Sequence, residues 1–231
     1  MDIILETKNL CKNYFNKKAL NDFNLKLEKG KVFGLLGPNG SGKTTFIKIA
    51  TGLLRQSSGE ILISGNKPSV KTKEIVSYLP DKNYLYRWMK ISDAIELFKD
   101  FYKDFDENKC NELLEFMKLD KSLKVTALSK GMLEKLNLTL VLSRKAKLYI
   151  LDEPLAAVDP VAREQILDAI IKNYNEDSSM IITTHLVHDI ERVFDDVAFI
   201  KDGTIVLQGN AEDLRCEKGK SIDELFREVF Q

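Results

Sequence analysis

The nine residues GPNGSGKTT, at positions 37–45, lie between an apolar run, VFGLL, and a segment of helical pattern, FIKIATGLL. They match the pattern G-x-x-x-x-G-K-[ST], whose glycines leave backbone N–H groups uncovered and allow positive φ angles. N–H groups in such a loop wrap a phosphate, and the N-terminus of the following helix adds partial positive charge. The stretch therefore predicts a strand–loop–helix unit that binds phosphate.

Individual residues of this loop have expected roles. Lys43 is expected to reach the β- and γ-phosphates of a nucleotide, and the Thr44 hydroxyl is expected to hold Mg²⁺. The nucleotide-binding residues expected here are Asn39, Gly40, Ser41, Gly42, Lys43, Thr44 and Thr45. A glycine-rich turn that matches by chance is the alternative, and the strand–loop–helix context disfavours it.

Three short apolar runs, at 32–37, 148–152 and 180–185, are typical of buried parallel strands, and each precedes a segment of helical pattern. Together they predict an α/β core. Three more strands are expected at 3–10, 19–28 and 59–65. A hairpin with the turn KDGT is expected over 197–209, and an amphipathic helix over the final SIDELFREVF.

The pattern changes between 82 and 145. In ISDAIELFKDFYKDF, apolar residues recur at helical spacing, with Ser92 as the expected N-cap; they are Ile91, Ile95, Phe98, Tyr102 and Phe105. KCNELLEFMKL and KGMLEKLNLTLVLSR also have helical patterns. We expect an all-helical insertion in the α/β core.

Composition limits the possible partners. The chain has 231 residues, with 35 basic and 35 acidic side chains, which disfavours nucleic acid as the main partner. Its three cysteines, Cys11, Cys110 and Cys216, form no CxxC pair, so a reducing compartment is expected. No secretory signal and no apolar run of about 20 residues is seen, so any membrane span is expected in another chain.

A second candidate site follows the strand in KLYILDEP, residues 147–154. Asp152 is suited to hold Mg²⁺, and Glu153 is suited to orient or deprotonate an attacking water. The alternative is an acidic loop after a strand, ended by Pro154.

With both motifs in place, the sequence resembles the ATP-binding cassette (ABC) ATPases over nearly its whole length. Further motifs occur in the order of that family: Tyr14 in KNYFNKKAL, SYLPD at 77–81, LSKGM at 128–132, AAVD at 156–159 and His185 in ITTH. The resemblance implies an α/β P-loop NTPase (RecA-like) core with an N-terminal antiparallel β subdomain and an inserted all-helical subdomain. The core would comprise 1–81 and 146–231, and the helical subdomain 82–145.

The resemblance also implies roles for these residues. Tyr14 would stack on adenine, although Phe15 is an alternative, and His185 would contact the γ-phosphate. Ser129 and Gly131 would contact the γ-phosphate bound by an opposite subunit. Asp159 would belong to the D-loop, and both Ser129 and Asp159 also suit helix N-caps.

ATP is then sandwiched between two chains, as a homodimer or as a heterodimer with a paralogous cassette. A transmembrane permease subunit would be the further partner, which places the protein in the cytoplasm on the inner face of the plasma membrane. NYLYRWMKI, residues 83–91, would then pack in the core or form a groove that receives a short helix of the membrane subunit.

The sequence departs from the family pattern in two motifs. Asp81 replaces a glutamine and would still be a metal ligand; Lys130 and Met132 replace a glycine and a glutamine of the signature motif. Because Glu153 and His185 are both present, hydrolysis is expected. These variants resemble a bacterial subgroup that includes exporters of amphipathic peptides such as phenol-soluble modulins. The rivals are soluble ABC proteins of DNA repair or chromosome structure, two-cassette translation factors and a non-catalytic nucleotide sensor.

Overall fold

The computed structural model describes residues 2–156, 158–174 and 177–230. Its central sheet has six strands in the order β5-β6-β7-β3-β8-β9, parallel except at the final β8–β9 pair. The strands are β3 (Val32–Leu36), β5 (Val76–Leu79), β6 (Leu148–Asp152), β7 (Ser179–Thr184), β8 (Asp196–Lys201) and β9 (Thr204–Asn210). Every residue of β3, β6 and β7 is buried, which explains why these strands are continuous apolar runs.

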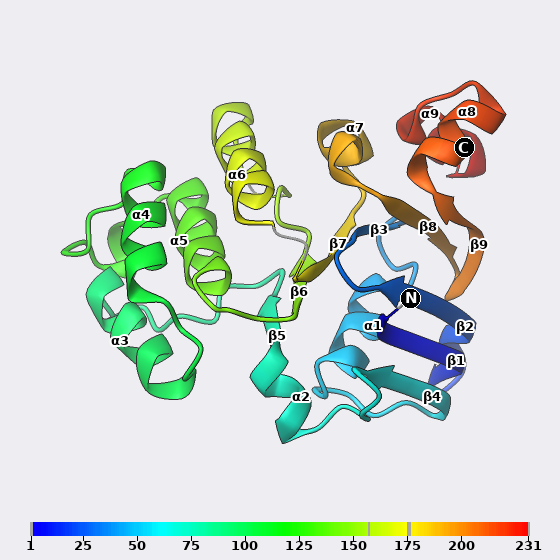
Figure 1. The fold of residues 1–231 in the computed structure, drawn as a ribbon, viewed down its shortest axis with the longest axis horizontal. Helices are drawn as coiled ribbons and strands as arrows, with labels where there is room; N and C mark the ends of the chain where they lie inside the picture. The colour runs from blue at the N-terminus through cyan, green and yellow to red at the C-terminus, as the bar shows by residue number, and fades with distance from the viewer. Residues whose placement is uncertain (1, 157, 175–176, 231) are drawn as a thin grey trace.

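A second, antiparallel sheet has the order β2-β1-β4 and lies beside the central sheet in Figure 1. It is formed by β1 (Ile3–Tyr14), β2 (Lys17–Glu28) and β4 (Ser58–Ile63). Helix α1 (Lys43–Ala50) packs between the two sheets, with the rings of Phe23 and Phe46 5.0 Å apart. This packing fixes the start of α1 at the carboxyl end of β3.

Between β5 and β6 the chain forms a group of helices, drawn at the left of Figure 1. They are α3 (Ile91–Phe101), α4 (Glu107–Met117), the 3₁₀ helix η1 (Val125–Ala127) and α5 (Lys130–Leu142). Their apolar faces join the core that covers one face of the central sheet. Helix α2 (Val70–Ile75) and β5 lie between this helical group and the antiparallel sheet (Figure 1).

The remaining helices follow β6, β7 and β9. They are α6 (Pro160–Asn173), α7 (Val187–Ile190), the 3₁₀ helix η2 (Glu191–Val193), α8 (Ala211–Lys218) and α9 (Ile222–Phe230). Along the described ranges, no helix combines the length and apolar character needed to cross a lipid bilayer.

The predicted α/β architecture is confirmed, and so is the β8–β9 hairpin, whose turn holds Asp202 and Gly203 at positive φ.

The predicted N-cap of α3, Ser92, is wrong. The cap is Lys90 rather than Ser92, because Asp93 accepts the Lys90 N–H at 2.8 Å and Ile91 can then bury its side chain within the first turn.

Helix α3 also ends before the last two residues of the predicted apolar pattern. Tyr102 is its C-cap and Phe105 lies beyond it. Both rings still contact Phe98, at centroid distances of 5.3 and 6.1 Å. The helical spacing therefore continued by chance into a loop that folds back onto the same apolar surface.

Candidate active site

The loop between β3 and α1 forms a cradle whose shape is fixed by close packing. A Cβ on Gly37 would lie 2.5 Å from the Ile200 carbonyl oxygen, and a Cβ on Gly42 would lie 2.6 Å from that of Ala19. Gly42 also has φ +117°, which disfavours other residues. The Gly203 N–H donates to the Ser41 carbonyl oxygen at 2.8 Å and ties the cradle to the β8–β9 turn.

The loop turns tightly at Ser41, whose N–H donates to the Pro38 carbonyl oxygen at 3.3 Å. Ser41 still lines the cavity into which the loop opens.

The cradle opens into a cavity of about 540 Å³. The structure brings together around it most of the predicted site residues, from five separate segments of the chain. They are Tyr14, Asn39, Gly40, Ser41, Gly42, Lys43, Thr44, Thr45, Asp81, Glu153 and His185; Lys17, Ala19 and Ala156 line it as well. Phe15 is fully exposed and does not line the cavity, so Tyr14 is the better placed ring.

A chain of polar contacts runs through the cavity. The buried Lys43 ammonium donates to the Gly37 carbonyl oxygen at 2.6 Å and lies 3.2 Å from Glu153 Oε1. The other oxygen of Glu153 lies 2.9 Å from His185 Nδ1. The predicted phosphate-binding lysine, carboxylate and histidine are thus in direct contact.

Glu153 adopts an unusual backbone conformation, with φ +53°. Left-handed backbone is uncommon for a residue other than glycine and is typical of functional positions. The Glu153 N–H donates to the Thr183 carbonyl oxygen of the neighbouring strand at 3.0 Å, which holds this conformation in place. The turn directs the carboxylate into the cavity while Asp152 remains in the sheet.

Asp152 ends β6 and is buried. Its Oδ1 accepts the Thr183 hydroxyl at 2.7 Å, and Oδ2 is buried without a hydrogen-bond partner among the described residues. Burial raises the pKa of Asp152, whereas the Thr183 hydroxyl and the nearby Thr44 hydroxyl lower it, and the charges of Asp81 and Glu153 raise it further. A carboxylate oxygen of this kind suits a hard divalent cation.

Ser129, Gly131 and Asp159 do not line the cavity and form a second group. Ser129 caps α5 by accepting the Met132 N–H at 3.2 Å, and Asp159 caps α6 by accepting the Ala162 N–H at 3.0 Å, as the sequence predicts. A Cβ on Gly131 would lie 3.6 Å from Asp159 Oδ2, so the two helix starts are adjacent. Within the AAVD motif, Ala157 lies outside the described residues.

Sequence reasoning missed the role of Thr183, which supports both Asp152 and Glu153. It precedes His185 by two residues in ITTH, and β6 pairs with β7 so that Asp152 faces Thr183. Only that strand pairing, which no local pattern reveals, gives the residue its place.

Comparisons with known proteins agree with this geometry. A family model described as ABC transporter matches residues 20–156. The chain is 32% identical over 217 residues to the ABC transporter ATP-binding protein YtrB of Bacillus subtilis (strain 168), covering 93% of this chain and 74% of that one. It is 30% identical over 225 residues to the lantibiotic transport ATP-binding protein SrtF of Streptococcus pyogenes, covering 96% of each.

A solved structure described as the ATP binding subunit of an ABC transporter superposes with a TM-score of 0.87 at 27% identity, covering 99% of this chain and 100% of that one. The fold, the cavity and the family match agree. The chain therefore belongs to the ABC transporter family, as an ATP-binding subunit with the P-loop fold of ATP-hydrolysing cassettes.

Proposed function

We propose that this chain is one of two cassettes that close around ATP and Mg²⁺, hydrolyse the ATP and so drive a separate membrane-spanning subunit. The observation that carries the proposal is the contact of Lys43 with Glu153 and of Glu153 with His185 inside the cradle cavity. This arrangement places a phosphate-binding cation, a general base and a hydrogen-bond donor at one point.

The triphosphate would occupy the cradle, with the adenine against the exposed ring of Tyr14. Lys43 would exchange its contact with Glu153 for the β- and γ-phosphates. That exchange frees Glu153 to accept a proton from water. Because His185 Nδ1 faces Glu153, its Nε2 is the ring nitrogen left for the γ-phosphate, and it would donate there when both ring nitrogens carry a proton.

We assign the metal ligands to Thr44, Asp81 and Asp152. The unpartnered Oδ2 of Asp152 supports the assignment, and Thr44 and Asp81 both line the cavity beside it. When bound, Mg²⁺ would neutralise negative charge on the phosphate oxygens. Asp81 contributes a full charge where the family pattern has a neutral glutamine, which favours the metal but repels phosphate.

The second cassette would supply Ser129 and Gly131 to the nucleotide bound by the first. Both residues lie outside the cavity of their own chain, and Ser129 is exposed at the start of α5. A homodimer, or a heterodimer with a paralogous cassette, would complete each site. Asp159, adjacent to Gly131, would lie at the same interface.

Analytical ultracentrifugation tests the dimer. The Glu153→Gln protein, which should retain ATP, is expected to dimerise only when ATP and Mg²⁺ are both present. Adding Ser129→Arg should abolish the dimer by placing a bulky charge at the interface, whereas Ser122→Arg, at another exposed serine, should not. Equal behaviour of the two arginine variants would contradict this arrangement.

For the transported substrate we propose amphipathic peptides moved outward across the plasma membrane. The support is the relative SrtF, named for lantibiotic transport, together with the resemblance to exporters of phenol-soluble modulin type. The chain would then lie in the cytoplasm, bound to the membrane through its partner. Inverted vesicles that contain the complex should take up a fluorescent amphipathic peptide only with ATP.

A soluble ABC ATPase that acts on nucleic acid or in translation is the alternative. The helices of the described ranges are at most 14 residues long, which gives no long coiled coil of the DNA-repair type. Co-purification of a polytopic membrane protein with this chain in detergent would separate the two functions.

A further inference from the structure

One arginine, Arg163, links the segment that follows β6 to the segment that follows β7. It lies in the first turn of α6, and its side chain is 29% exposed. Its Nε donates to the Val158 carbonyl oxygen at 3.2 Å, and its Nη1 donates to Asp189 Oδ2 at 2.7 Å. Two hydrogen bonds, the second of them between opposite charges, therefore join the start of α6 to α7.

The contact with Asp189 holds the segment that carries His185. Helix α7 is a single turn that starts two residues after His185. A helix this short has little stability of its own, so its position depends on tertiary contacts. Val187 and Ile190 are buried on one face of α7, and the bridge from Asp189 to Arg163 ties down the other. The orientation of His185 therefore depends in part on Arg163.

The contact with Val158 holds the other end of this link. Val158 is buried and precedes Asp159, whose side chain caps α6. A Cβ on Gly131 would lie 3.9 Å from Val158 Cγ1 and 3.6 Å from Asp159 Oδ2. Arg163 thus joins the His185 segment to residues that adjoin the start of α5.

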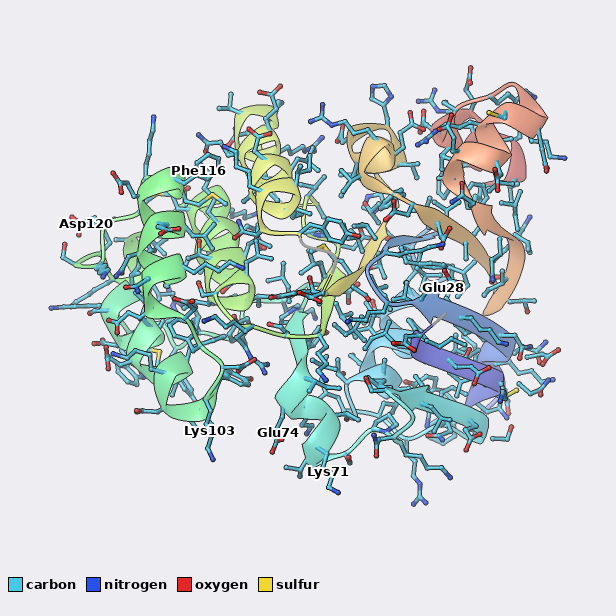
Figure 2. The ribbon with its side chains drawn as sticks, viewed as in Figure 1. Glu28, Lys71, Glu74, Lys103, Phe116 and Asp120 are labelled. Atoms are coloured by element: carbon cyan, nitrogen blue, oxygen red, sulfur yellow. The ribbon has the colours of Figure 1, made fainter. Side chains whose placement is uncertain are left out.

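A hollow of about 380 Å³ lies beside this link, between α6, α7 and α9. Arg163, His185 and Asp189 line it, together with Asp223 and Arg227 of α9, which pair with each other at 2.6 Å. Figure 1 shows α6 and α7 next to each other, and Figure 2 shows side chains of both helices in the space between them. Among the described residues, no other salt bridge joins α6 to α7. Because of the hollow, close packing alone does not fix the spacing of these two helices.

We propose that Arg163 is a positioning residue for ATP hydrolysis, which holds α7 so that His185 keeps its contact with Glu153 and its orientation toward the γ-phosphate. Arg163 does not line the nucleotide cavity, so it acts through α7 and not on the nucleotide. A displacement of about 1 Å in a catalytic group costs up to about 10²-fold in rate, whereas a partly exposed ion pair adds little to folding stability. Loss of the link should therefore affect turnover more than stability. This role rests on the proposed function and adds one residue to it.

The test compares Arg163→Ala with Arg215→Ala in the full chain bound to its membrane-spanning subunit. Arg215 is a matched control, because its side chain is 28% exposed and also donates to one carboxylate, Glu212 at 3.1 Å, and to one carbonyl oxygen, that of Glu191 at 2.7 Å. It lies on α8, outside the link. Arg163→Ala should lower kcat for ATP about tenfold and change KM less than about twofold. Arg215→Ala should change neither constant, although urea unfolding should show a similar small loss of stability for both.

A charge exchange tests the contact itself. Arg163→Asp should lower kcat at least as much as Arg163→Ala, because it places two carboxylates together. The double variant Arg163→Asp, Asp189→Arg should recover part of that loss, since it restores the ion pair but not the hydrogen bond to the Val158 carbonyl oxygen. Arg163→Lys should also recover part, because it keeps the charge. A double variant whose loss equals the sum of the two single losses would contradict the link.

The placement of His185 can also be measured without turnover. The chain has two histidines, so its imidazole NMR spectrum contains two sets of signals, which His188→Gln assigns. Arg163→Ala should shift or broaden the signals of His185, and Arg215→Ala should leave them in place. Unchanged His185 signals, or equal kcat of the two alanine variants, would overturn the role of Arg163. Absence of Mg²⁺-dependent ATP hydrolysis by the wild-type complex would overturn the proposed function instead, and the His185 signals would still decide whether Arg163 positions α7.

Discussion

The loop after β5 contributes Asp81 to the nucleotide cavity and Pro80 and Lys82 to a separate groove of about 510 Å³, which the end of α1, α2 and α3 also line. The charges of the cavity and of this groove are arranged in opposite ways. In the cavity, Lys43 is buried against Glu153 and a carbonyl oxygen. In the groove, Lys48, Lys73 and Lys82 are exposed without acidic partners in the described ranges. The difference is that the cavity lysine meets its counter-charge within this chain, whereas the groove lysines face solvent.

The largest effect should come from Glu153→Gln in the cavity. The amide retains the shape of the side chain but cannot accept a proton, so ATP turnover should fall by about 10²- to 10⁴-fold while ATP still binds. Steady-state phosphate release and nucleotide binding measure the two effects. Glu164→Gln, at an exposed carboxylate of α6, is the control and should keep normal turnover. Turnover of Glu153→Gln close to wild type would remove Glu153 from the chemistry.

Helix α1 carries one lysine at the cavity, Lys43, and one at the groove, Lys48, so the ATP affinities of their alanine variants compare the two regions. Lys43→Ala should lower ATP affinity by about 100-fold, because it deletes a charge-assisted contact to phosphate in a buried site. Lys48→Ala, which alters the groove end of the same helix, should leave ATP affinity unchanged. Isothermal titration with ATP measures both variants. A similar loss in both would mean that the two regions are not functionally separate.

Glu134 on α5 lies between the two regions and should make stability depend on pH. Burial first and the charge of Asp81 second raise its pKa to about 7 from 4.5. The pKa of Tyr84 in the groove is raised chiefly by burial, then by Tyr102 and by the charge of Glu134. The folded chain therefore binds more protons than the unfolded chain across this window. As a result, the free energy of unfolding contributed by this group falls as pH rises from about 4.5 to about 7.

Glu134→Gln should remove this dependence and raise the free energy of unfolding at pH 8 by about 1–3 kcal/mol relative to wild type. Urea unfolding of the nucleotide-free protein at several pH values measures it. Asp81→Asn should give a smaller change of the same sign, because it removes only the second cause of the shift. Parallel pH profiles of wild type and Glu134→Gln would contradict the assignment.

The smallest effect should come from Trp88→Ala. Its ring is exposed, so its loss should cost little folding stability and weaken binding of the membrane subunit by about tenfold or less. ATP affinity should not change, because Trp88 does not line the nucleotide cavity. Val206→Ala, an exposed apolar residue of β9, is the control. Equal losses of partner binding and ATP binding would contradict a separate docking role.

The sequence predicted elements whose signal is local. The buried strands β3, β6 and β7 are apolar runs, and the caps at Ser129 and Asp159 precede helices with the expected hydrogen bonds. Helix α2 and strand β5 were not anticipated, since one is short and largely polar and the other has only four residues. At α3 the start depended on Asp93 and on the burial of Ile91, which outweighed the capping preference of Ser92.

Of the two sites assembled from distant residues, the nucleotide cavity could be predicted from the sequence and the groove could not. Motif residues of the nucleotide cavity were found because each has a recognisable local pattern. The lysines of the groove are far apart in the sequence and have no shared pattern, so only folding of α1, α2 and the following loop brings them to one surface. Thr183 and Glu134 were missed for the same reason, because their roles depend on neighbours from other elements.

The stacked pair of Tyr86 and Trp88 has a practical consequence. Because Trp88 is the single tryptophan among the 231 residues, selectively excited indole emission reports on the surroundings of one exposed ring. Covering that ring by a docked helix should shift its emission to the blue. Addition of ATP alone should change the Trp88 emission only if nucleotide binding in the cavity alters the segment 83–91 through the loop that contains Asp81. One fluorescence measurement therefore reports both on partner binding and on coupling to the nucleotide cavity.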